Sequence, residues 1–417
     1  MKRRPHFDGV GRYGFLRHGF SMNLMAWITG KEKKIKPLPF AVYWLTVLTL
    51  TGAGLVAAIY LSVSHYRVYT DVGYKSFCAI SRAINCDTVS QSPYSIFGGL
   101  PVPIWGVIGY TFLLLFLPLA AAKGAEKKRI WALIFWISLV FSAYSVVLAF
   151  ISSYYIGSYC IMCIVSYGVN LSILFYSWMV RRRFSNCGLI ADTREDLLFL
   201  WKKKMTAALI FPTFLAGVLL IWIFIPSYWH IQPPHLADHI PTGVTAEGHP
   251  WIGAREPLLE ITEFTDYQCF QCKKMHSLLR RIVSENADRI RIVHRNYPMD
   301  NKFNPIVKQP FHIGAGKMAL LAIFAESKDK FWEMNDYLYN VAHQQGRIEI
   351  KELAQTLDLN AGDLGRSLND AENRFKLQRD IQAGNKLGIT GTPAYVINGK
   401  VYLGQIPAEV LKSGMQD

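Results

Sequence analysis

The sequence predicts a polytopic α-helical membrane bundle followed by a soluble α/β domain. Five apolar runs within residues 1–226 each reach the ~20 residues that a helix needs to cross a bilayer. Hydrophobic residues make up 51% of the 417-residue chain and charged residues only 18%, which excludes a disordered chain and argues against an entirely soluble one. Alternating strand and helix patterns begin only near residue 250. The chain is therefore expected to have a membrane half and a soluble half.

The apolar runs define the membrane half. Their predicted bounds are Phe40–Ser64, Val102–Ala122, Ile130–Tyr155, Tyr159–Val180 and Thr206–Pro226. The first run is too long and begins too late for a cleavable signal peptide. A membrane helix tolerates Pro212, inside the fifth run, when a neighbour satisfies the freed carbonyl group. We therefore expect a four-helix bundle at residues 38–180, with residues 181–226 holding a cytoplasmic loop and a fifth, linking helix.

The basic residues predict the orientation in the membrane. Nine of them lie in residues 1–37, and further clusters lie in residues 123–129 and 181–204. Because Lys and Arg accumulate in cytoplasmic loops, these segments should be cytoplasmic, and everything after residue 226 should be outside. Residues 1–244 hold 23 basic and 9 acidic residues, whereas residues 245–417 hold 22 and 21. The net charge of +15 is thus mainly a topology signal, and we expect no nucleic-acid partner.

Residues 227–249 are rich in Pro, His and Gly and have no hydrophobic period, which predicts a linker. Its histidines are candidates for a metal site: His230, His235, His239 and His249. Their irregular spacing and the lack of a nearby cysteine favour solvated linker residues instead.

The cysteines carry the strongest chemical signal. Six of the seven fall outside by the predicted topology and form three local pairs: Cys78 with Cys86, Cys160 with Cys163, and Cys269 with Cys272. Structural disulfides and a zinc site are both possible interpretations in an oxidising compartment. A C-x-x-C disulfide closes so short a ring that it stabilises little, which favours redox chemistry for the last two pairs. Cys187 is alone on the cytoplasmic side, and we expect an ordinary reduced thiol there.

The soluble half, residues 250–417, begins its pattern with a strand at Leu258–Thr265 and a helix at Lys273–Glu285. Cys269 lies at the turn between them, where its thiolate would meet the free N–H groups of the helix. A strand at Arg289–Arg295 and a mainly helical stretch at 310–385 follow. The last predicted elements are a Thr392-Pro393 turn, strands Ala394–Asn398 and Lys400–Leu403 joined by a hairpin turn, and a helix near Pro407.

This order of elements resembles the thioredoxin fold in its DsbA-like form, with a helical insertion. The motifs EFTDYQCFQC and GTPAYVINGKVYLG carry the resemblance, which covers residues 250–417. It implies that Pro393 is a cis proline beside the C-x-x-C motif and that Glu263 helps to carry the proton of the buried Cys272 thiol. The dipeptide between the cysteines is Phe-Gln, not the Pro-His of the most oxidising members, so the redox potential stays open.

The membrane half is similar to the vitamin K epoxide reductase family over residues 38–180. Two loop cysteines, a serine six residues after the second, and a C-x-x-C motif that opens the fourth helix carry this resemblance. It implies that Cys163 faces a quinone, that Cys160 exchanges with Cys86, and that Cys78 receives electrons from the soluble domain. It also implies that Ser92 and Tyr167 donate hydrogen bonds near the quinone head group, whereas Asn170 matches the family pattern without a clear role.

Bacterial members fused to a thioredoxin-like domain make disulfides with a quinone as oxidant. The resemblance therefore implies a thiol oxidase of the bacterial inner membrane with a periplasmic thioredoxin-like domain. Its partners would be reduced exported proteins, membrane lipid, and ubiquinone or menaquinone, with no metal. One alternative is a quinone or vitamin K epoxide reductase that uses the thioredoxin-like domain as electron donor. Others are a membrane-anchored binding or chaperone domain with structural disulfides, and an electron exporter, for which Cys187 alone is a poor entry point.

Overall fold

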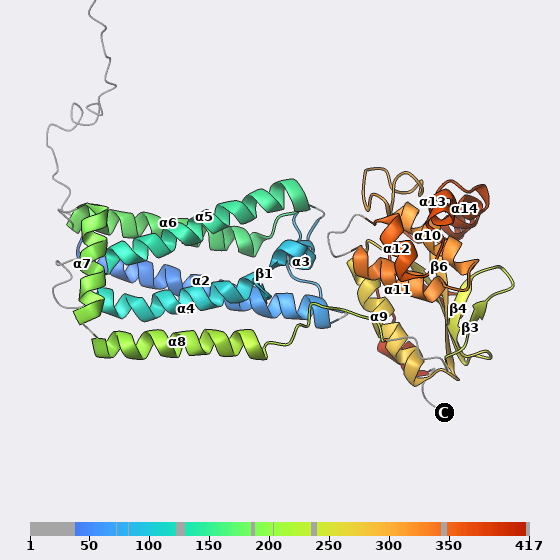
Figure 1. Ribbon diagram of the computed structural model, residues 1–417, viewed down its shortest axis with the longest axis horizontal. Helices are drawn as coiled ribbons and strands as arrows, with labels where there is room; N and C mark the ends of the chain where they lie inside the picture. The colour runs from blue at the N-terminus through green and yellow to red at the C-terminus, as the bar shows by residue number, and fades with distance from the viewer. Residues whose placement is uncertain are drawn as a thin grey trace, which may run out of the picture.

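The protein has a helical bundle at one end and an α/β domain at the other, as a computed structural model shows (Figure 1). The structure describes residues 38–71, 73–81, 83–121, 130–184, 188–202, 204–234, 240–342 and 348–413. The basic N-terminal segment, the basic cluster at 123–129, Cys187, His235 and His239 lie outside the described residues. The expected order of a membrane bundle followed by an α/β domain is confirmed.

Four long apolar helices form the bundle: α2 (Phe40–Thr70), α4 (Val102–Ala120), α5 (Trp131–Ile151) and α6 (Ile161–Phe184). A π-helical turn, η3 (Ser152–Ile156), continues α5. All four helices are long and apolar enough to cross a membrane. Their buried core contains Val47 of α2, Leu117 of α4, Ile134 of α5 and Ile173 of α6. Each helix therefore packs an apolar stripe against the other three.

Helix α7 (Leu189–Lys202) lies across the end of the bundle away from the α/β domain, in a segment for which we predicted only a loop (Figure 1). Asp196 of α7 accepts hydrogen bonds from the backbone N–H groups of Ile130, Ala132 and Leu133, at 2.6, 2.9 and 3.2 Å. These N–H groups belong to the first turn of α5, where a helix has no partners of its own. Helix α7 therefore caps α5 from a distant part of the sequence.

Helix α8 (Lys204–Phe224) runs back beside α4, and the rings of Phe112 and Phe214 lie 4.9 Å apart. Its described apolar stretch is Phe211–Phe224. The first loop, which joins α2 to α4 (residues 71–101), contains helix α3 (Cys86–Gln91), a 3₁₀ turn η1 (Pro93–Ser95) and the short strands β1 (Ile96–Phe97) and β2 (Leu100–Pro101). This loop lies at the end of the bundle that faces the α/β domain (Figure 1).

A six-stranded sheet forms the centre of the α/β domain, in the order β3-β4-β6-β5-β7-β8. Strands β5 and β6 are parallel and every other pair is antiparallel. The strands are β3 (Thr242–Val244), β4 (Pro250–Gly253), β5 (Leu259–Thr265), β6 (Ile290–Asn296), β7 (Ala394–Ile397) and β8 (Lys400–Leu403). Strand β5 contributes Ile261 to one buried cluster and Phe264 to another, so the sheet is covered on both faces.

The helices of this domain are α9 (Phe270–Glu285), α10 (Ala315–Glu326), α11 (Phe331–Val341), α12 (Ile350–Thr356), α13 (Ala361–Ser367), α14 (Ala371–Lys386) and α15 (Ala408–Ser413). The predicted strands, the C-x-x-C helix and the helical insertion between β6 and β7 are thus present. The fold is that of a thioredoxin-like domain with added helices, as predicted.

Two strands of the α/β domain, β3 and β4, were not predicted, and β3 lies inside the segment that we interpreted as a linker. Strand β3 pairs with β4 through the register Gly243 to Trp251. His249, in the turn between them, is not a solvated linker residue, because its Nδ1 lies 3.5 Å from a carboxylate oxygen of Asp380 and its side chain is mostly buried. A three-residue strand shows no period in the sequence. It forms because the edge of β4 supplies its hydrogen bonds.

Candidate active site

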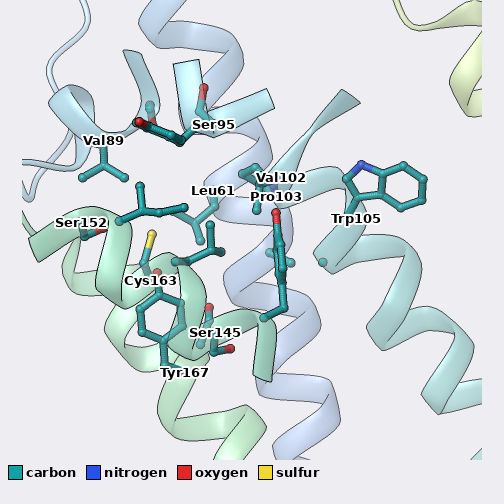
Figure 2. A pocket seen from close by; sticks show the side chains of 18 of the residues that line it. Leu61, Val89, Ser95, Val102, Pro103, Trp105, Ser145, Ser152, Cys163 and Tyr167 are labelled. Carbon is teal, nitrogen blue, oxygen red and sulfur yellow. The ribbon is translucent and has the colours of Figure 1, made fainter. Parts of the chain in front are cut away.

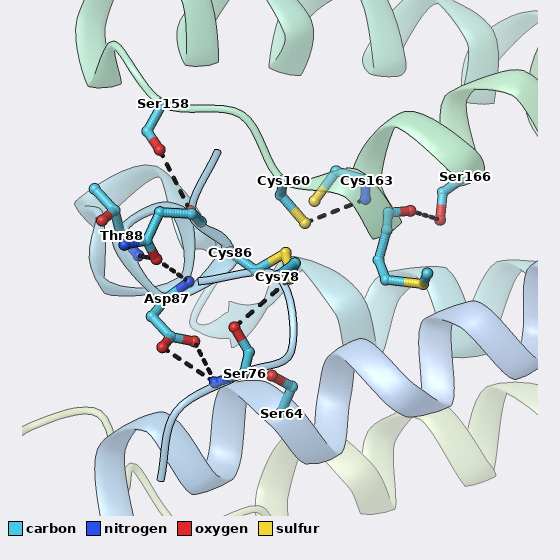
Figure 3. Close-up of a disulfide and its surroundings, with 12 residues drawn as sticks. Ser64, Ser76, Cys78, Cys86, Asp87, Thr88, Ser158, Cys160, Cys163 and Ser166 are labelled. Carbon is cyan, nitrogen blue, oxygen red and sulfur yellow. Dashed lines mark hydrogen bonds between the residues drawn. A yellow bond between two sulfur atoms is a disulfide. The ribbon is translucent and has the colours of Figure 1, made fainter. Parts of the chain in front are cut away.

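The first loop holds a disulfide between Cys78 and Cys86 (Figure 3). Cys86 is the first residue of α3, and the side chain of Asn85 caps this helix by accepting from the N–H groups of Asp87 and Thr88, at 2.9 and 3.1 Å. The other four described cysteines, Cys160, Cys163, Cys269 and Cys272, are thiols.

Asp87 holds the two sides of the disulfide loop together. Its buried carboxylate accepts from the backbone N–H of Ser76, with oxygen distances of 3.2 and 3.3 Å. The Ser76 hydroxyl in turn lies 3.6 Å from Cys78 Sγ. The segment that carries Cys78 is therefore attached to the helix that begins with Cys86 by a charge-assisted hydrogen bond as well as by the disulfide.

A short backbone pairing brings the first loop to the start of α6. The N–H of Asn85 donates to the carbonyl of Tyr159 at 3.0 Å, and the N–H of Tyr159 donates to the carbonyl of Ala83 at 2.8 Å. Each paired segment is followed directly by a cysteine, Cys86 in one and Cys160 in the other. Both cysteines and Cys78 belong to one buried cluster, and Figure 3 shows Cys160 beside the disulfide.

The Cys160–Cys163 pair opens α6. The backbone N–H of Cys163 donates to Cys160 Sγ at 3.2 Å, so Cys160 occupies the position of a helix cap. Cys163 is only partly buried, and it lines a cavity inside the bundle (Figure 2). The pair therefore connects the disulfide of the first loop with this cavity.

The cavity has a volume of about 200 Å³ and contains both residues that were expected near a quinone, Ser92 and Tyr167. Tyr167 lies one turn after Cys163 on α6 (Figure 2). The Ser92 hydroxyl donates to the carbonyl of Val89 at 2.7 Å, so its oxygen keeps its acceptor capacity toward the cavity. Most of the other lining residues are apolar or aromatic, including Leu61, Val102, Pro103, Trp105, Phe141 and Leu148.

Asn170 was singled out from the sequence without a clear role, whereas other polar residues of the cavity wall, Tyr110, Ser145 and His65 among them, were not. Tyr110 donates to Asn170 Oδ1 at 2.7 Å, and Asn170 Nδ2 donates to Ser145 Oγ at 2.9 Å, which links α4, α6 and α5. His65 of α2 is fully buried between Tyr228 and Ser95, at 2.8 and 3.3 Å. His65 directly follows the first predicted run, Phe40–Ser64, and only the structure places it inside a membrane helix, where an ionisable residue marks a candidate functional position.

In the α/β domain, Cys269 caps α9 in the same way that Cys160 caps α6. The N–H of Cys272 lies 3.2 Å from Cys269 Sγ, and this sulfur lies 3.4 Å from the carbonyl oxygen of Thr392. The Thr392–Pro393 peptide bond is cis, as expected, and it brings the proline loop against the C-x-x-C motif. Cys269, the N-terminal thiol of the pair, is thus at the start of α9, and Cys272, one turn into the helix, is completely buried.

The two thiols of this pair differ in acidity. Burial raises the pKa of Cys269, but the hydrogen bonds from Cys272 and the charge interaction with His312 outweigh it, so this pKa lies below its usual value. Burial raises the pKa of Cys272 well above its usual value, and the neighbouring Cys269 raises it further. The pair therefore has one thiol suited to attack and leaving and one that holds its proton.

Glu263 lies in a buried row of polar side chains that crosses the sheet below the thiols. It pairs in register with His294 of β6 and with Tyr395 of β7. Its carboxylate lies 2.8 Å from His294 Nδ1. Burial raises the pKa of Tyr395 well above its usual value, and the charges of Glu263 and Cys272 add to this effect. Tyr395 thus lies within electrostatic reach of both groups. No sequence pattern singled out His294.

Comparisons with known proteins match this division of the chain. A model of the vitamin K epoxide reductase family matches residues 45–178, and a thioredoxin model matches residues 245–417. Vitamin K epoxide reductase complex subunit 1 of Mus musculus is 33% identical over 143 residues, which are 32% of this chain and 88% of that protein. The chain belongs to the vitamin K epoxide reductase family.

Other relatives match different shares of the chain. Disulfide bond formation protein D of Bacillus subtilis is 24% identical over 165 residues, 37% of this chain and 70% of that protein. The Na(+)/H(+) antiporter NhaA 3 of Salinispora tropica is 26% identical over 165 residues, 39% of this chain, and the chain covers only 24% of its length. Among solved structures, a thioredoxin-like oxidoreductase from Silicibacter pomeroyi is 20% identical, with a TM-score of 0.34 over 41% of this chain and 91% of that one.

These matches give the general character of this family member. It joins a vitamin K epoxide reductase-like domain, whose four long helices are apolar enough to cross a membrane, to a thioredoxin-like domain.

Proposed function

We propose that this protein is a quinone-dependent thiol oxidase that introduces disulfide bonds into exported proteins. Electrons pass from a client dithiol to Cys269/Cys272, then to Cys78/Cys86, then to Cys160/Cys163, and finally to a membrane quinone. Each protein step is a thiol–disulfide exchange, in which a thiolate attacks one sulfur and the other sulfur leaves as a thiolate. The net reaction converts a client dithiol and a quinone into a client disulfide and a quinol.

One observation carries the proposal: the pairing of Asn85 with Tyr159 brings Cys86 and Cys160 into one buried cluster, and Cys163 lines the cavity. A structural disulfide needs no second thiol pair packed against it. Here the disulfide packs against the first thiol of the Cys160–Cys163 pair, and the second thiol of that pair lines the cavity. This order is what a relay with a small-molecule acceptor requires.

The cavity suits a quinone head group. Among the described residues that line it there is no Lys, Arg, Asp or Glu, and the polar groups are hydroxyls, one amide, one imidazole and the Cys163 thiol. A flat, uncharged ring with two acceptor oxygens fits such a mainly apolar wall with a few donors. Tyr167 would donate to it beside Cys163, whereas the Ser92 hydroxyl, which donates to the Val89 carbonyl, would have to turn to do so. When bound, ubiquinone or menaquinone supplies the acceptor for two electrons and two protons.

The proposal includes a topology. The basic clusters favour a cytoplasmic N-terminus and five membrane helices in a bacterial inner membrane, with the thioredoxin-like domain in the periplasm. The arrangement in Figure 1 supports this, because the first loop and the α/β domain share one end of the bundle and α7 lies at the other. All three relay pairs would then face the side to which exported clients have access.

The test uses purified full-length protein in detergent, a reduced client peptide and a ubiquinone or menaquinone analogue. Quinone reduction and thiol loss are followed together in the wild type, in Cys163→Ala and in Cys187→Ala. We expect one quinone consumed per peptide disulfide, abolished in Cys163→Ala and unchanged in Cys187→Ala. Thiol loss without quinone consumption would exclude the oxidase relay.

The same assay distinguishes the oxidase from the alternative, a reductase that uses the thioredoxin-like domain as electron donor. The similarity to a vitamin K epoxide reductase complex subunit of Mus musculus suggests this alternative. A quinone epoxide replaces the quinone, and the product is identified. We expect no epoxide-dependent thiol loss. Epoxide consumption at the rate of quinone consumption would favour the reductase.

A further inference from the structure

Lys274 of the α/β domain forms hydrogen bonds with the membrane bundle. Lys274 lies on the C-x-x-C helix α9, and its ammonium group donates to the carbonyl oxygens of Val68 and Asp71, at 2.8 and 3.3 Å. These oxygens belong to the C-terminal end of α2 in the membrane bundle. The lysine is 5% exposed, so the contact is shielded from water.

The end of a helix is a site that attracts a cation. The last carbonyl groups of a helix have no partners within it, and the negative end of the helix dipole lies there. In α2 the Arg67 carbonyl accepts from the N–H of Asp71, and Lys274 binds the Val68 carbonyl next to it. Lys274 thus caps a helix of the other domain. Its neighbour Lys273 is also buried, with 8% exposure, but makes no hydrogen bond to α2 within the described residues.

Two further contacts lie on the same face of α9. Phe270, the first of the two residues between the redox cysteines, packs edge-on against Tyr69 of α2, with ring centroids 5.0 Å apart. Ser277 Oγ donates to the carbonyl of Gln232, in the segment after α8, at 3.0 Å. Phe270, Lys274 and Ser277 are spaced i, i+4 and i+7, which places them along one stripe of the helix. The dipeptide between the cysteines is therefore part of the interface with the membrane bundle.

The charges around Lys274 belong to the redox groups of both domains. Burial lowers the pKa of Lys274 to about 8, and the charges of Asp87, Asp71 and the Cys269 thiolate act in the opposite direction. At neutral pH the lysine therefore still carries its proton and donates to α2. Asp87 is the residue that holds the Cys78–Cys86 loop, so Lys274 interacts electrostatically with both the thiol that would attack and the loop that would be attacked.

We propose that Lys274 is a positioning residue that docks the thioredoxin-like domain on the end of α2 for reoxidation. This role rests on the proposed relay. In the step that it serves, the Cys269 thiolate attacks Cys78 Sγ and the Cys78–Cys86 bond breaks, with Cys86 leaving as a thiolate. The Cys272 thiolate then attacks Cys269 and releases Cys78. Two electrons pass to the loop pair, and the protons lost by Cys269 and Cys272 end on Cys78 and Cys86.

Docking by Lys274 has a consequence for clients. In the docked arrangement Phe270 is covered by Tyr69, and Cys269 is buried. A client polypeptide needs access to Cys269, so the domain has to leave α2 before it can accept client electrons. Client oxidation and reoxidation therefore alternate, and a variant without the lysine should lose reoxidation while keeping the client step.

The test measures the docked step alone in the full-length Cys272→Ser variant. Cys269 can then attack the loop disulfide but nothing resolves the product, so a Cys78–Cys269 disulfide accumulates without an external oxidant. Exchange is started by raising the pH from acid to neutral and stopped with N-ethylmaleimide, and the linked peptides are measured by mass spectrometry. We expect Lys274→Met to slow their formation about tenfold or more, because a charged hydrogen bond is lost. Lys273→Met, the matched control, should stay within about twofold of the parent.

A second measurement guards against misfolding. With Cys272 present, the preoxidised Cys269/Cys272 pair is mixed with a reduced client peptide, and one turnover is followed. Lys274→Met should keep the wild-type rate; should it fail to fold, Lys274→Gln takes its place. The proposal would be overturned if a folded Lys274 variant formed the Cys78–Cys269 disulfide as fast as Lys273→Met does. If no Cys78–Cys269 disulfide formed even with Lys274 intact, the exchange between Cys269 and the loop disulfide would be excluded. The docking role of Lys274 in that exchange would then be excluded with it.

Discussion

Glu263 and His294 lie side by side on the two parallel strands of the sheet and share a hydrogen bond of 2.8 Å, with side chains that are 1% and 0% exposed. Tyr395 of β7 pairs with Glu263 of β5 in the sheet register, and its hydroxyl is buried without a hydrogen-bond partner in the described part of the chain. Cys272, whose pKa is well raised, lies within electrostatic reach of the same tyrosine. A buried carboxylate near a thiol that holds its proton is suited to receive that proton.

Glu263→Gln should therefore slow the reoxidation of the Cys269/Cys272 pair by the membrane domain. In that step the Cys272 thiol has to lose its proton before it can resolve a mixed disulfide. Because proton transfer by a placed base contributes about 10²–10⁴-fold, we expect a loss of at least tenfold. Stopped-flow measurement of reoxidation between pH 6 and 9 gives the rate, and the difference from wild type should shrink as the pH rises.

Glu260→Gln is the matched control for this prediction. Glu260 lies on the same strand, is largely exposed, and contacts Arg291 at 3.2 Å. Surface pairs of this kind contribute little, so its reoxidation rate should equal that of the wild type. Equal rates for Glu263→Gln and Glu260→Gln would assign Glu263 to packing with His294 alone.

The acidity of Cys269 predicts a pH dependence of stability for the reduced protein. Its pKa is lower in the folded state than in the unfolded chain, so the thiolate stabilises the folded, reduced domain above the unfolded pKa. This contribution is lost as the pH falls through the lowered pKa. The melting temperature of the reduced domain should therefore fall relative to that of the oxidised domain as the medium is acidified. Calorimetry of both redox forms measures this. Cys269→Ala has neither this thiolate nor the Cys269–Cys272 disulfide, so its melting temperature should change with pH as that of the oxidised wild type does.

Local patterns were sufficient for the parts of the structure that depend on neighbouring residues. Apolar length predicted α2, α4, α5 and α6, and the strand before Cys269 predicted the cap that this residue forms on α9. The capping role of Asp196 could not be predicted, because its partners are the backbone N–H groups of a helix far away in the sequence. Strand β3 was missed for the same reason: its hydrogen bonds come from β4 and not from its own composition.

The candidate site shows the same division. The cysteine pairs and Tyr167 followed from spacing and resemblance, whereas the contacts that bring them together are long-range. The pairing of Asn85 with Tyr159 joins the first loop to the start of α6 through backbone atoms, which leave no mark on residue type. Lys274 is one of two adjacent lysines, and only the structure separates the one that reaches α2 from the one that does not.

Asp87→Ala should loosen the first loop. Its carboxylate is buried and accepts from the N–H of Ser76, so the substitution leaves that backbone donor without a partner, at a cost of about 1–3 kcal/mol. We expect slower exchange between the reduced Cys78/Cys86 pair and the oxidised Cys160/Cys163 pair, measured with a maleimide reagent as the rate at which free loop thiols are lost. Asp71→Asn changes an exposed carboxylate paired with Arg67 and should leave that rate unchanged. A wild-type rate in Asp87→Ala would mean that the disulfide and the α3 cap hold the loop without it.

Asn170→Ala should weaken quinone binding and leave thiol exchange intact. Asn170 accepts from Tyr110 and donates to Ser145, so it holds three helices around the cavity. Hydrogen bonds between membrane helices are worth about 0.6–1.7 kcal/mol each, which predicts a rise of roughly 3- to 20-fold in the quinone KM. Ser172→Ala removes a hydroxyl on the same helix that bonds only to the Gly168 carbonyl within it, and its KM should not change. The rate of exchange between Cys86 and Cys160 is measured in parallel. If Asn170→Ala slowed that exchange as much as it raised the KM, the residue would act through the packing of the whole bundle and not through the wall of the cavity.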